Sequence, residues 1–413
     1  MKIRKPVLLL ICLLFSQLIW ASNISYEEAQ QKAVQFLNRQ TAPAGPGSRM
    51  RMPVSVNKLS LAKDANTYYV FNVGQKEGFV LVSADDRAPA ILGYADDGCF
   101  DSENIPENMR TWLQGYADQL QWLKQHPRQS SGAPVLDEHA AIAPLLTSTW
   151  DQAYPYNIFC PIDEGRSTYT GCVATAMAQI LYYYKYPAKT LAAMPGFTTL
   201  TKGITVGRVD VAAINWRYMK DHYTGDEPTA QKNAVAKLMQ LCGTSVYMDY
   251  TNAGSGAYSE NVPDALKNYF DFDAASTFAS RNDYRARAWD NLVYNELANS
   301  RPVYYSAQSV GGGHAFVIDG YDKEGLYHVN WGWSGSCNGY FLLSILDPDD
   351  NSGSGASSST DGYSFGQDAI IGAQPNTGVV PQTEVKMTTY SLWPDETSTF
   401  PLTNDVYPVT FYA

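Results

Sequence analysis

The order of helical and β patterns in the second half of the chain most restricts its fold. Helical patterns come first there: apolar residues recur at i, i+3, i+4 and i+7 in 170–184, and 229–242 and 289–299 are also helical. Short β-rich runs follow at 303–306, 315–321, 327–331, 340–343 and 368–372. A helical half followed by an antiparallel β half predicts an α+β domain, which we bound at residues 141–376.

The first 21 residues have the pattern of an export signal. A basic start, an apolar run at Val7–Leu14 and the small residue Ala21 are typical of a secretory signal peptide. We expect cleavage after Ala21 and a secreted protein without a membrane span, since no stretch reaches the roughly 18 apolar residues that a span needs. Lipidation at Cys12 is the alternative, disfavoured because Cys12 lies inside the bulky apolar run.

Residues 22 to about 125 have the pattern of one small α+β unit. The string S-Y-E-E at 25–28 is a capping box before an amphipathic helix. Two β-rich runs, at 68–73 and 78–83, flank G-Q-K-E-G and predict a hairpin. A closing helix is expected over 109–123.

A linker and a short tail complete the predicted organisation. Residues 126–143 are polar and contain Pro, Gly and Ser, which is typical of an exposed linker that proteases cut. We therefore assign residues 22–140 to a separate unit with its cleavable linker. Residues 377–413 alternate Thr, Val, Tyr and Phe in short β-like runs and predict a short C-terminal extension.

Charge and motif content exclude several classes of function. The net charge of −11 argues against nucleic-acid binding, which needs clustered Lys and Arg. The sequence has no C-x-x-C, H-E-x-x-H or EF-hand motif, so we expect no metal and no cofactor. Without Cys12, an odd number of the six cysteines remains, so at least one is unpaired within the chain. A Cys160–Cys337 disulfide stays open.

Cys172 is the candidate nucleophile because it lies in the first turn of the predicted helix 170–184. The unpaired N–H groups and the dipole at a helix start stabilise a thiolate, so we expect a lowered pKa for Cys172. A papain-like fold presents its thiolate in this way. The alternative is a small buried cysteine that only fills space.

His314 is the candidate base, since a thiolate nucleophile requires one. It follows three glycines in G-G-G-H-A-F-V-I-D-G, and glycines let a backbone approach closely. It lies 142 residues after Cys172, within the roughly 130–150 residues typical of papain-type enzymes. The four other histidines lie in the linker, in a polar loop and in a strand: His126, His139, His222 and His328. A histidine that merely caps a strand end is the alternative for His314.

Two further strings supply supporting side chains. In Y-H-V-N-W-G-W-S-G, Asn330 is a candidate to orient the imidazole, and Trp331 and Trp333 are candidates to shield the ion pair from water. Tryptophans that are simply core residues are the alternative. Gln152, upstream of Cys172, is a candidate oxyanion donor together with the Cys172 N–H group, although it could equally be a surface loop residue.

Three strings together resemble the streptopain family of secreted bacterial cysteine proteases. They are T-G-C-V-A-T-A-M-A-Q-I, G-G-H-A-F-V-I-D-G and Y-H-V-N-W-G-W, and the resemblance covers residues 145 to about 375. It is nearest to the interpain- and periodontain-type zymogens of oral Bacteroidetes. The strings G-F-V-L-V-S-A-D at 78–85 and I-L-G-Y at 91–94 resemble the inhibitory prodomain of the same family.

The resemblance implies a papain-like catalytic domain behind an α+β prodomain. By carry-over, Cys172 is the nucleophile, His314 the base and Gln152 the oxyanion donor. Two further substrate contacts are implied, and they are Gly313 and the loop Gly254-Ser255-Gly256. The tryptophan that matches Trp331 stands where papain has its asparagine, which leaves the role of Asn330 open. The cysteine motif departs from the C-G-S-C-W signature of papain.

The function expected from these residues is that of a secreted cysteine endopeptidase made as a self-inhibited zymogen. Its expected partners are protein and peptide substrates, host proteins among them, and the prodomain, whose acidic loop Asp101–Asn108 we expect to reach the site. The resemblance also implies a hydrophobic preference at the second residue before the cut. A transferase would use the same residues but pass the acyl group to an amine. A non-catalytic adhesin is disfavoured because nucleophile and base are both present.

Overall fold

The computed structural model describes residues 23–40, 53–125, 137–284, 286–309, 312–345 and 366–378. The predicted signal peptide, the linker up to residue 136 and nearly all of the C-terminal extension lie outside them. By backbone contacts the chain divides into residues 1–379 and 380–413, and all the described residues belong to the first unit. No helix in the described ranges is long and apolar enough to cross a membrane.

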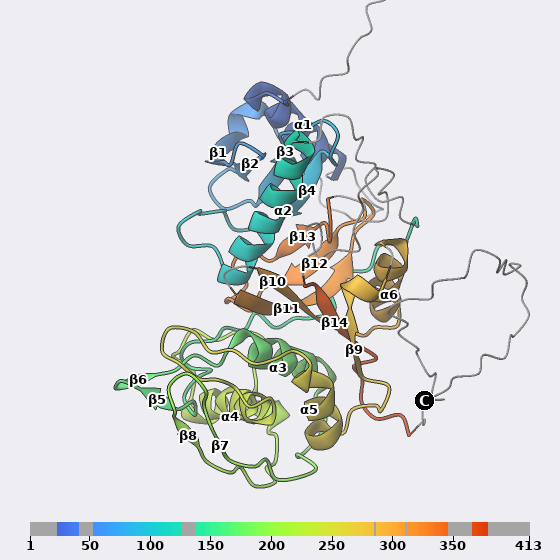
Figure 1. Cartoon of the computed structure of the whole chain (residues 1–413). Coiled ribbons are helices and arrows are strands. Elements are labelled where there is room, and N and C mark those ends of the chain that lie inside the picture. Colours follow the sequence, from blue (N-terminus) through green and yellow to red (C-terminus); the bar gives the residue numbers. More distant parts are fainter. Residues whose placement is uncertain are drawn as a thin grey trace, which may run out of the picture. The chain divides into compact units, whose positions relative to one another are not determined.

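One antiparallel sheet joins the N-terminal and C-terminal parts of the described chain (Figure 1). Its order is β1-β2-β3-β4-β13-β12-β11-β10-β14-β9. The strands are β1 (Leu59–Asp64), β2 (Tyr68–Val73), β3 (Phe79–Ser83), β4 (Ile91–Ala95), β9 (Thr277–Ser280), β10 (Val303–Ser309), β11 (Gly312–Tyr321), β12 (Tyr327–Asn330), β13 (Gly339–Phe341) and β14 (Asp368–Ile371). Two small hairpins lie apart from it, β5 (Ile162–Asp163) with β6 (Arg166–Ser167) and β7 (Phe197–Thr198) with β8 (Thr205–Val206).

The junction between the two parts is the pairing of β4 with β13. Tyr340 lies opposite Tyr94, and Phe341 lies opposite Gly93. A side chain at Gly93 would not fit, since an added Cβ would lie 2.5 Å from the Phe341 ring. The sheet of the N-terminal part therefore continues into the sheet of the C-terminal part.

The helices confirm most of the predicted pattern. They are α1 (Tyr26–Gln40), α2 (Glu107–Gln125), α3 (Cys172–Tyr184), α4 (Thr229–Ser245), α5 (Asn261–Phe270) and α6 (Ala286–Ala298), with 3-10 turns η1 (Val56–Lys58), η2 (Trp216–Tyr218) and η3 (Arg281–Asp283). The capping box is present: the Glu28 N–H donates to Ser25 Oγ at 3.2 Å, and the Ser25 N–H donates to Glu28 Oε2 at 2.9 Å.

The sequence predicts that helix α4 ends at residue 242, with Gly243 in the following position that favours a left-handed residue. This predicted end is wrong, because α4 continues through Gly243 to Ser245. An added Cβ at Gly243 would lie 2.0 Å from the Tyr250 hydroxyl oxygen. This glycine therefore serves a close tertiary approach inside the helix instead of a left-handed turn.

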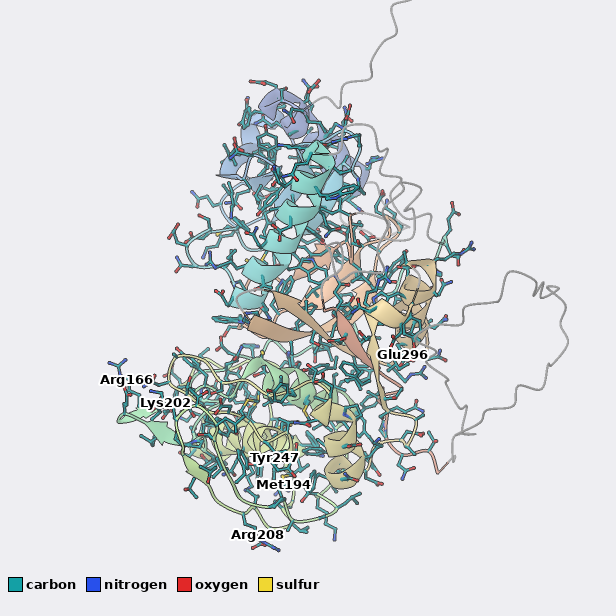
Figure 2. All side chains as sticks on the ribbon, viewed as in Figure 1. Arg166, Met194, Lys202, Arg208, Tyr247 and Glu296 are labelled. Carbon is teal, nitrogen blue, oxygen red and sulfur yellow. The ribbon has the colours of Figure 1, made fainter. Side chains whose placement is uncertain are left out.

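The two faces of the sheet belong to different hydrophobic clusters. On one face, α2 and α6 pack over Tyr305, Phe316 and Trp331. On the other, α3, α4 and α5 pack against Tyr304 and Ala315. Figure 2 shows the side chains of this helical half, with Met194 among them. The alternation of side chains along β10 and β11 thus assigns neighbouring residues to opposite cores.

The N-terminal strands have helices on both faces as well. Helix α1 covers one face and places Phe36 against Val80, Val82 and Tyr94. Helix α2 covers the other face, over Phe79 and Leu81, and continues onto β10 and β11 (Figure 1). A single helix therefore spans the junction between the two parts of the sheet.

Candidate active site

Helix α3 begins at Cys172, one residue after a glycine that no other residue could replace without strain. Gly171 has φ 86° and ψ 143°. An added Cβ there would lie 2.6 Å from Met248 Sδ and 2.9 Å from the Ser255 carbonyl oxygen. The start of α3 is thereby held against the segment that contains the predicted cleft loop at 254–256.

The Cys172 thiol is held by β11. The Ala315 N–H donates to Cys172 Sγ at 3.4 Å. Burial raises the pKa of the Cys172 thiol, and the backbone N–H groups of Ala315 and Val173 only partly oppose this. The expected lowering of the pKa is therefore wrong for this state of the chain, in which desolvation outweighs the helix start.

His314 precedes Ala315 on β11 and lies opposite Ala307 on β10. Since Ala315 faces the α3 side, strand alternation directs the His314 side chain to the α2 side, together with Phe316. Burial lowers the pKa of His314, while the Glu107 carboxylate at the start of α2 raises it. Both shifts, for Cys172 and His314, favour a neutral thiol and a neutral imidazole.

A prodomain side chain lies where β11 and β12 diverge. The Asn108 amide of α2 donates to the Trp331 carbonyl oxygen at 2.6 Å and to the Ala315 carbonyl oxygen at 3.4 Å. Asn108 is the last residue of the predicted acidic loop, but it belongs to α2 and is uncharged. The acidic residue Asp101 instead folds back locally, where it accepts from Asn104 at 2.7 Å.

Gln152 lies beside the start of α3. Its backbone carbonyl oxygen accepts from the Thr170 N–H at 3.1 Å. The Asp151 carboxylate fixes this turn, because its Oδ1 accepts from the N–H groups of Gln152 and Ala153 at 2.6 and 3.0 Å. Gly254 and Gly256 are exposed with open space at the Cβ position, and Gly313 is exposed on β11.

The residues of the N-W-G-W string have different surroundings. Asn330 is buried, and its Oδ1 accepts from Gln179 at 3.2 Å and from the Gly332 N–H at 3.1 Å, so this oxygen holds α3 and the following loop instead of His314. Trp331 is buried in the cluster under α2, where its ring lies 4.9 Å from Phe316. Trp333 is 37% exposed in the loop after it.

The other described histidines are engaged or remote. His328 Nδ1 is 2.6 Å from Asp319 Oδ1, and His139 Nε2 is 3.4 Å from Asp290 Oδ2. His222 is exposed in its polar loop. Among the described residues, His314 is thus the imidazole on the strand that holds the thiol.

The Cys160–Cys337 disulfide that the sequence left undecided is not formed. Cys160 and Cys337 are both free and lie in different clusters, on opposite sides of the sheet. In the described ranges no group of three His, Cys, Asp or Glu side chains is placed to hold a metal ion.

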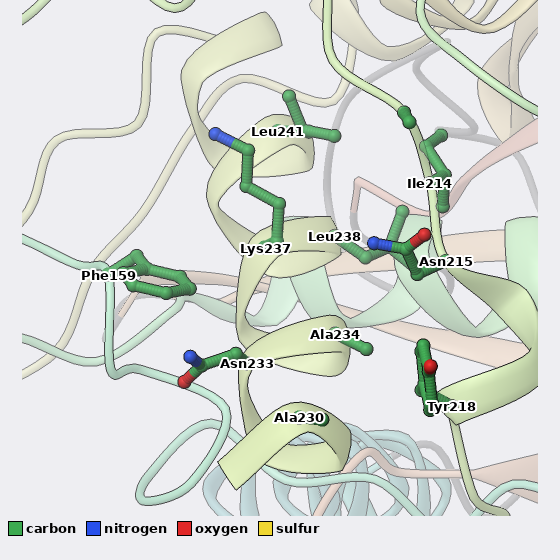
Figure 3. Close-up of a pocket in the computed structure, with 11 residues that line it drawn as sticks. Phe159, Ile214, Asn215, Tyr218, Ala230, Asn233, Ala234, Lys237, Leu238 and Leu241 are labelled. Carbon is green, nitrogen blue, oxygen red and sulfur yellow. The ribbon is translucent and has the colours of Figure 1, made fainter.

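A pocket of about 330 Å³ lies against α4, away from the thiol (Figure 3). Ile214 and Asn215 line it opposite the helix, and Lys237 is its one titratable side chain besides Tyr218. Burial lowers the pKa of Lys237. No cysteine or histidine lines this pocket, so it is not the site of the candidate thiol and imidazole.

Two protein families match different parts of the chain. Residues 150–341 match the Peptidase C10 family, and residues 21–120 match the Spi protease inhibitor family. Streptopain of Streptococcus pyogenes is 33% identical over 371 residues, which cover 84% of this chain and 91% of streptopain. The chain belongs to the peptidase C10 family. The thiol protease/hemagglutinin PrtT of Porphyromonas gingivalis is 35% identical over 400 residues, but the chain spans only 45% of that protein's length.

Solved structures agree with this assignment. A prointerpain A fragment of Prevotella intermedia has a TM-score of 0.66 and 34% identity, over 76% of this chain and 98% of the fragment. Active interpain A from the same organism has a TM-score of 0.50 and 35% identity, over 59% of this chain and 99% of that one. The prediction of a cysteine peptidase with an α+β prodomain is confirmed at this level.

Two individual roles around the C10 site were not predicted. Asn108 lies in the loop Asp101–Asn108 that was expected to reach the site, but no local signal distinguishes it from the other residues of that loop. Gln179 did give one, since it is, with Thr175, a polar residue on a largely apolar, buried face of the predicted helix. A buried amide of this kind must find hydrogen-bond partners, which makes it a candidate for a structural or positioning role.

Proposed function

We propose that the chain is the zymogen of a secreted cysteine endopeptidase in which Cys172 attacks the peptide carbonyl and His314 serves as base and acid. The observation that carries this is the hydrogen bond from Ala315 to Cys172 Sγ, which puts the residue next to His314 in contact with the nucleophile. In the active state the imidazole takes the thiol proton, and the resulting ion pair attacks. His314 then gives its proton to the leaving amine, and water releases the acyl group.

Gln152 and the Cys172 N–H group stabilise the oxyanion in this proposal. The position of Gln152 beside Thr170 supports it, because the helix start and the Gln152 turn are joined at the backbone. Gly313 and the 254–256 loop line the substrate strand, and the substrates are proteins, host proteins among them.

The test uses three full-chain variants. Cys172→Ala and His314→Ala should each abolish casein cleavage, whereas Cys242→Ala, which changes a buried thiol on α4, should retain it. Cleavage by the Cys172→Ala protein would show that the nucleophile is elsewhere. An amine acceptor added to the assay distinguishes hydrolysis from acyl transfer.

Latency in this proposal comes from α2. Helix α2 covers the His314 side of β11, and Asn108 bridges Ala315 and Trp331, so the imidazole stays apart from the thiol. Removal of residues 22 to about 136 frees the imidazole to pair with Cys172. Side-by-side incubation of wild-type and Cys172→Ala zymogens tests self-processing: wild type should lose its N-terminal part and the variant should keep it. Equal loss in both would contradict self-processing.

The described end of the linker is built into the catalytic part, which moves the proposed cut upstream of residue 137. Arg287 donates to both carboxylate oxygens of Asp137, and His139 stacks on Tyr294 with ring centres 3.8 Å apart. Ile142 exchanges two backbone hydrogen bonds with Tyr321. Intact-mass analysis of the processed protein should give an N-terminus within 126–137. An N-terminus after Ile142 would contradict this boundary.

A further inference from the structure

Gln179 lies on α3 about two turns after Cys172, on the same side of the helix. Its side chain is completely buried. A buried primary amide is stable only when its donors and acceptor are paired, so its partners show what the residue holds.

Those partners come from the two segments that flank the thiol. Gln179 Oε1 accepts from Ser148 Oγ at 2.9 Å and from the Trp150 N–H at 3.3 Å. Gln179 Nε2 donates to Asn330 Oδ1 at 3.2 Å. Asn330 Nδ2 closes the ring by donating to the Ser148 carbonyl oxygen at 2.7 Å.

Each segment continues into a proposed element of the cleft. The Trp150 segment leads within two residues to Gln152, and the Asn330 segment leads through Gly332 to Trp333. The two also bind one another: the Ser334 N–H donates to the Trp150 carbonyl oxygen at 3.1 Å, and Ser334 Oγ donates to Asp151 Oδ2 at 2.7 Å. Gln179 is the residue of α3 that joins both segments to the helix carrying the nucleophile.

We propose that Gln179 is a positioning residue that sets the distance between Cys172 and the oxyanion donor Gln152. This rests on the proposed function. Gln179 does not touch the thiol or the imidazole, so it acts on the carbonyl step and leaves the ionisation of Cys172 unchanged.

Glutamine supplies both the acceptor that Ser148 and Trp150 need and the donor that Asn330 needs. Glutamate in its place keeps an acceptor for Ser148 and Trp150 but turns the donor toward Asn330 into a second acceptor, so that two oxygens face each other. Leucine removes all three hydrogen bonds and leaves buried donors and acceptors unpaired.

The experiment compares two reactions of the same thiol in full-chain variants after processing by wild-type enzyme. Peptide hydrolysis needs the oxyanion site, whereas alkylation of Cys172 by iodoacetamide does not. We expect Gln179→Glu and Asn330→Asp to lower kcat/KM for a peptide by about 100-fold, the typical consequence of a misplaced catalytic group. The alkylation rate and its pH profile should stay within about twofold.

A double variant tests the route of the effect. If Gln179 works through Gln152, Gln179→Glu combined with Gln152→Ala should lose far less than the product of the two single losses. Equal losses of hydrolysis and alkylation, or fully multiplicative losses, would overturn the proposal. If Gln179→Leu does not fold, the two isosteric variants still decide it.

A buried glutamine elsewhere provides the matched control. Gln367 accepts from the Tyr305 hydroxyl at 2.6 Å and donates to the Leu343 carbonyl oxygen at 2.9 Å, on the far face of the sheet from α3. Gln367→Glu should change the midpoint of urea unfolding without separating hydrolysis from alkylation. Failure of the proposed function is distinguishable, because then Gln152→Ala alone would leave hydrolysis unchanged.

Discussion

The two faces of strand β11 differ in what covers them and in how permanent that cover is. Ala315 and Val317 face α3, which belongs to the catalytic part itself. Phe316 and, by alternation, His314 face α2, which the proposed activation removes. One strand therefore carries a permanent core on one side, while its other side is shared between the removable α2 and α6, which stays with the catalytic part. The nucleophile lies on the permanent side and its proposed base on the removable side.

The largest effect is expected from the removable side. Trp112 on α2 is 6% exposed, and its ring lies 5.6 Å from Phe316 and 6.5 Å from Trp331. In a Cys172→Ala background, Trp112→Ala should lower the free energy of unfolding of the zymogen by about 3–5 kcal/mol. Urea unfolding measures this. The exposed Gln114→Ala on the same helix is the control, and a loss from Trp112→Ala no larger than the control's would contradict a packed α2.

The permanent side should behave differently. Leu181 on α3 is completely buried among the residues under Ala315 and Val317. Leu181→Ala should lower the free energy of unfolding by about 2–5 kcal/mol in the zymogen and by the same amount in the processed enzyme, because the neighbours of Leu181 stay in place. The same urea series, run on both forms, checks it. A cost confined to the zymogen would mean that α3 also depends on the prodomain.

Asn108 gives a smaller effect with a sharper chemical readout. Asn108→Ala leaves the buried carbonyl oxygens of Trp331 and Ala315 without this donor. The loss should destabilise the closed zymogen by about 1–3 kcal/mol. Since each 1.4 kcal/mol is about tenfold in an equilibrium, labelling of zymogen Cys172 by a thiol-directed epoxide should accelerate by about 5- to 150-fold. Asn104→Ala, in the exposed turn before α2, is the matched control. Unchanged labelling would show that Asn108 does not restrain the site.

Much of this arrangement could be predicted from local patterns. Sequence patterns located α2, α3 and most strands of the main sheet to within a few residues, since apolar spacing reports which side of an element is buried, but β1, β4 and β9 were not predicted. The strings around Cys172 and His314 were informative because the first lies at the start of a predicted helix and the second follows three glycines, which allow a close backbone approach.

The remainder depends on contacts between distant residues. Nothing near Gly93 or Phe341 indicates that β4 pairs with β13, because the register of a strand pair is set by its partner. The end of α4 was misplaced because Tyr250, outside the helix, requires the space at Gly243. The pKa of Cys172 was predicted in the wrong direction, since helix position is local but burial depends on what packs around the thiol.

The smallest effect concerns pH. Burial lowers the pKa of His314 from its usual 6.5, so the closed zymogen binds fewer protons than the unfolded chain. The contribution of neutral His314 to the free energy of unfolding is present above about pH 6.5. It is lost as the pH falls below that value, by at most about 1.4 kcal/mol per pH unit for one proton. Urea unfolding of the Cys172→Ala zymogen between about pH 7.5 and 5 measures the slope.

The difference between two variants isolates His314 within that slope. The Glu107 carboxylate on α2 partly opposes the lowering of the His314 pKa. Burial raises the pKa of Asp368 to about 6, so this carboxyl destabilises the folded chain as the pH rises, which is the opposite direction to His314. Asp368 is present in Cys172→Ala and in Cys172→Ala combined with His314→Gln, so its titration cancels in the comparison, whereas the influence of Glu107 is part of the His314 contribution. The double variant should lose the acid-dependent part that belongs to His314. Identical slopes would place the imidazole in solvent on the removable side, and α2 would then not be the cover that keeps it from the thiol.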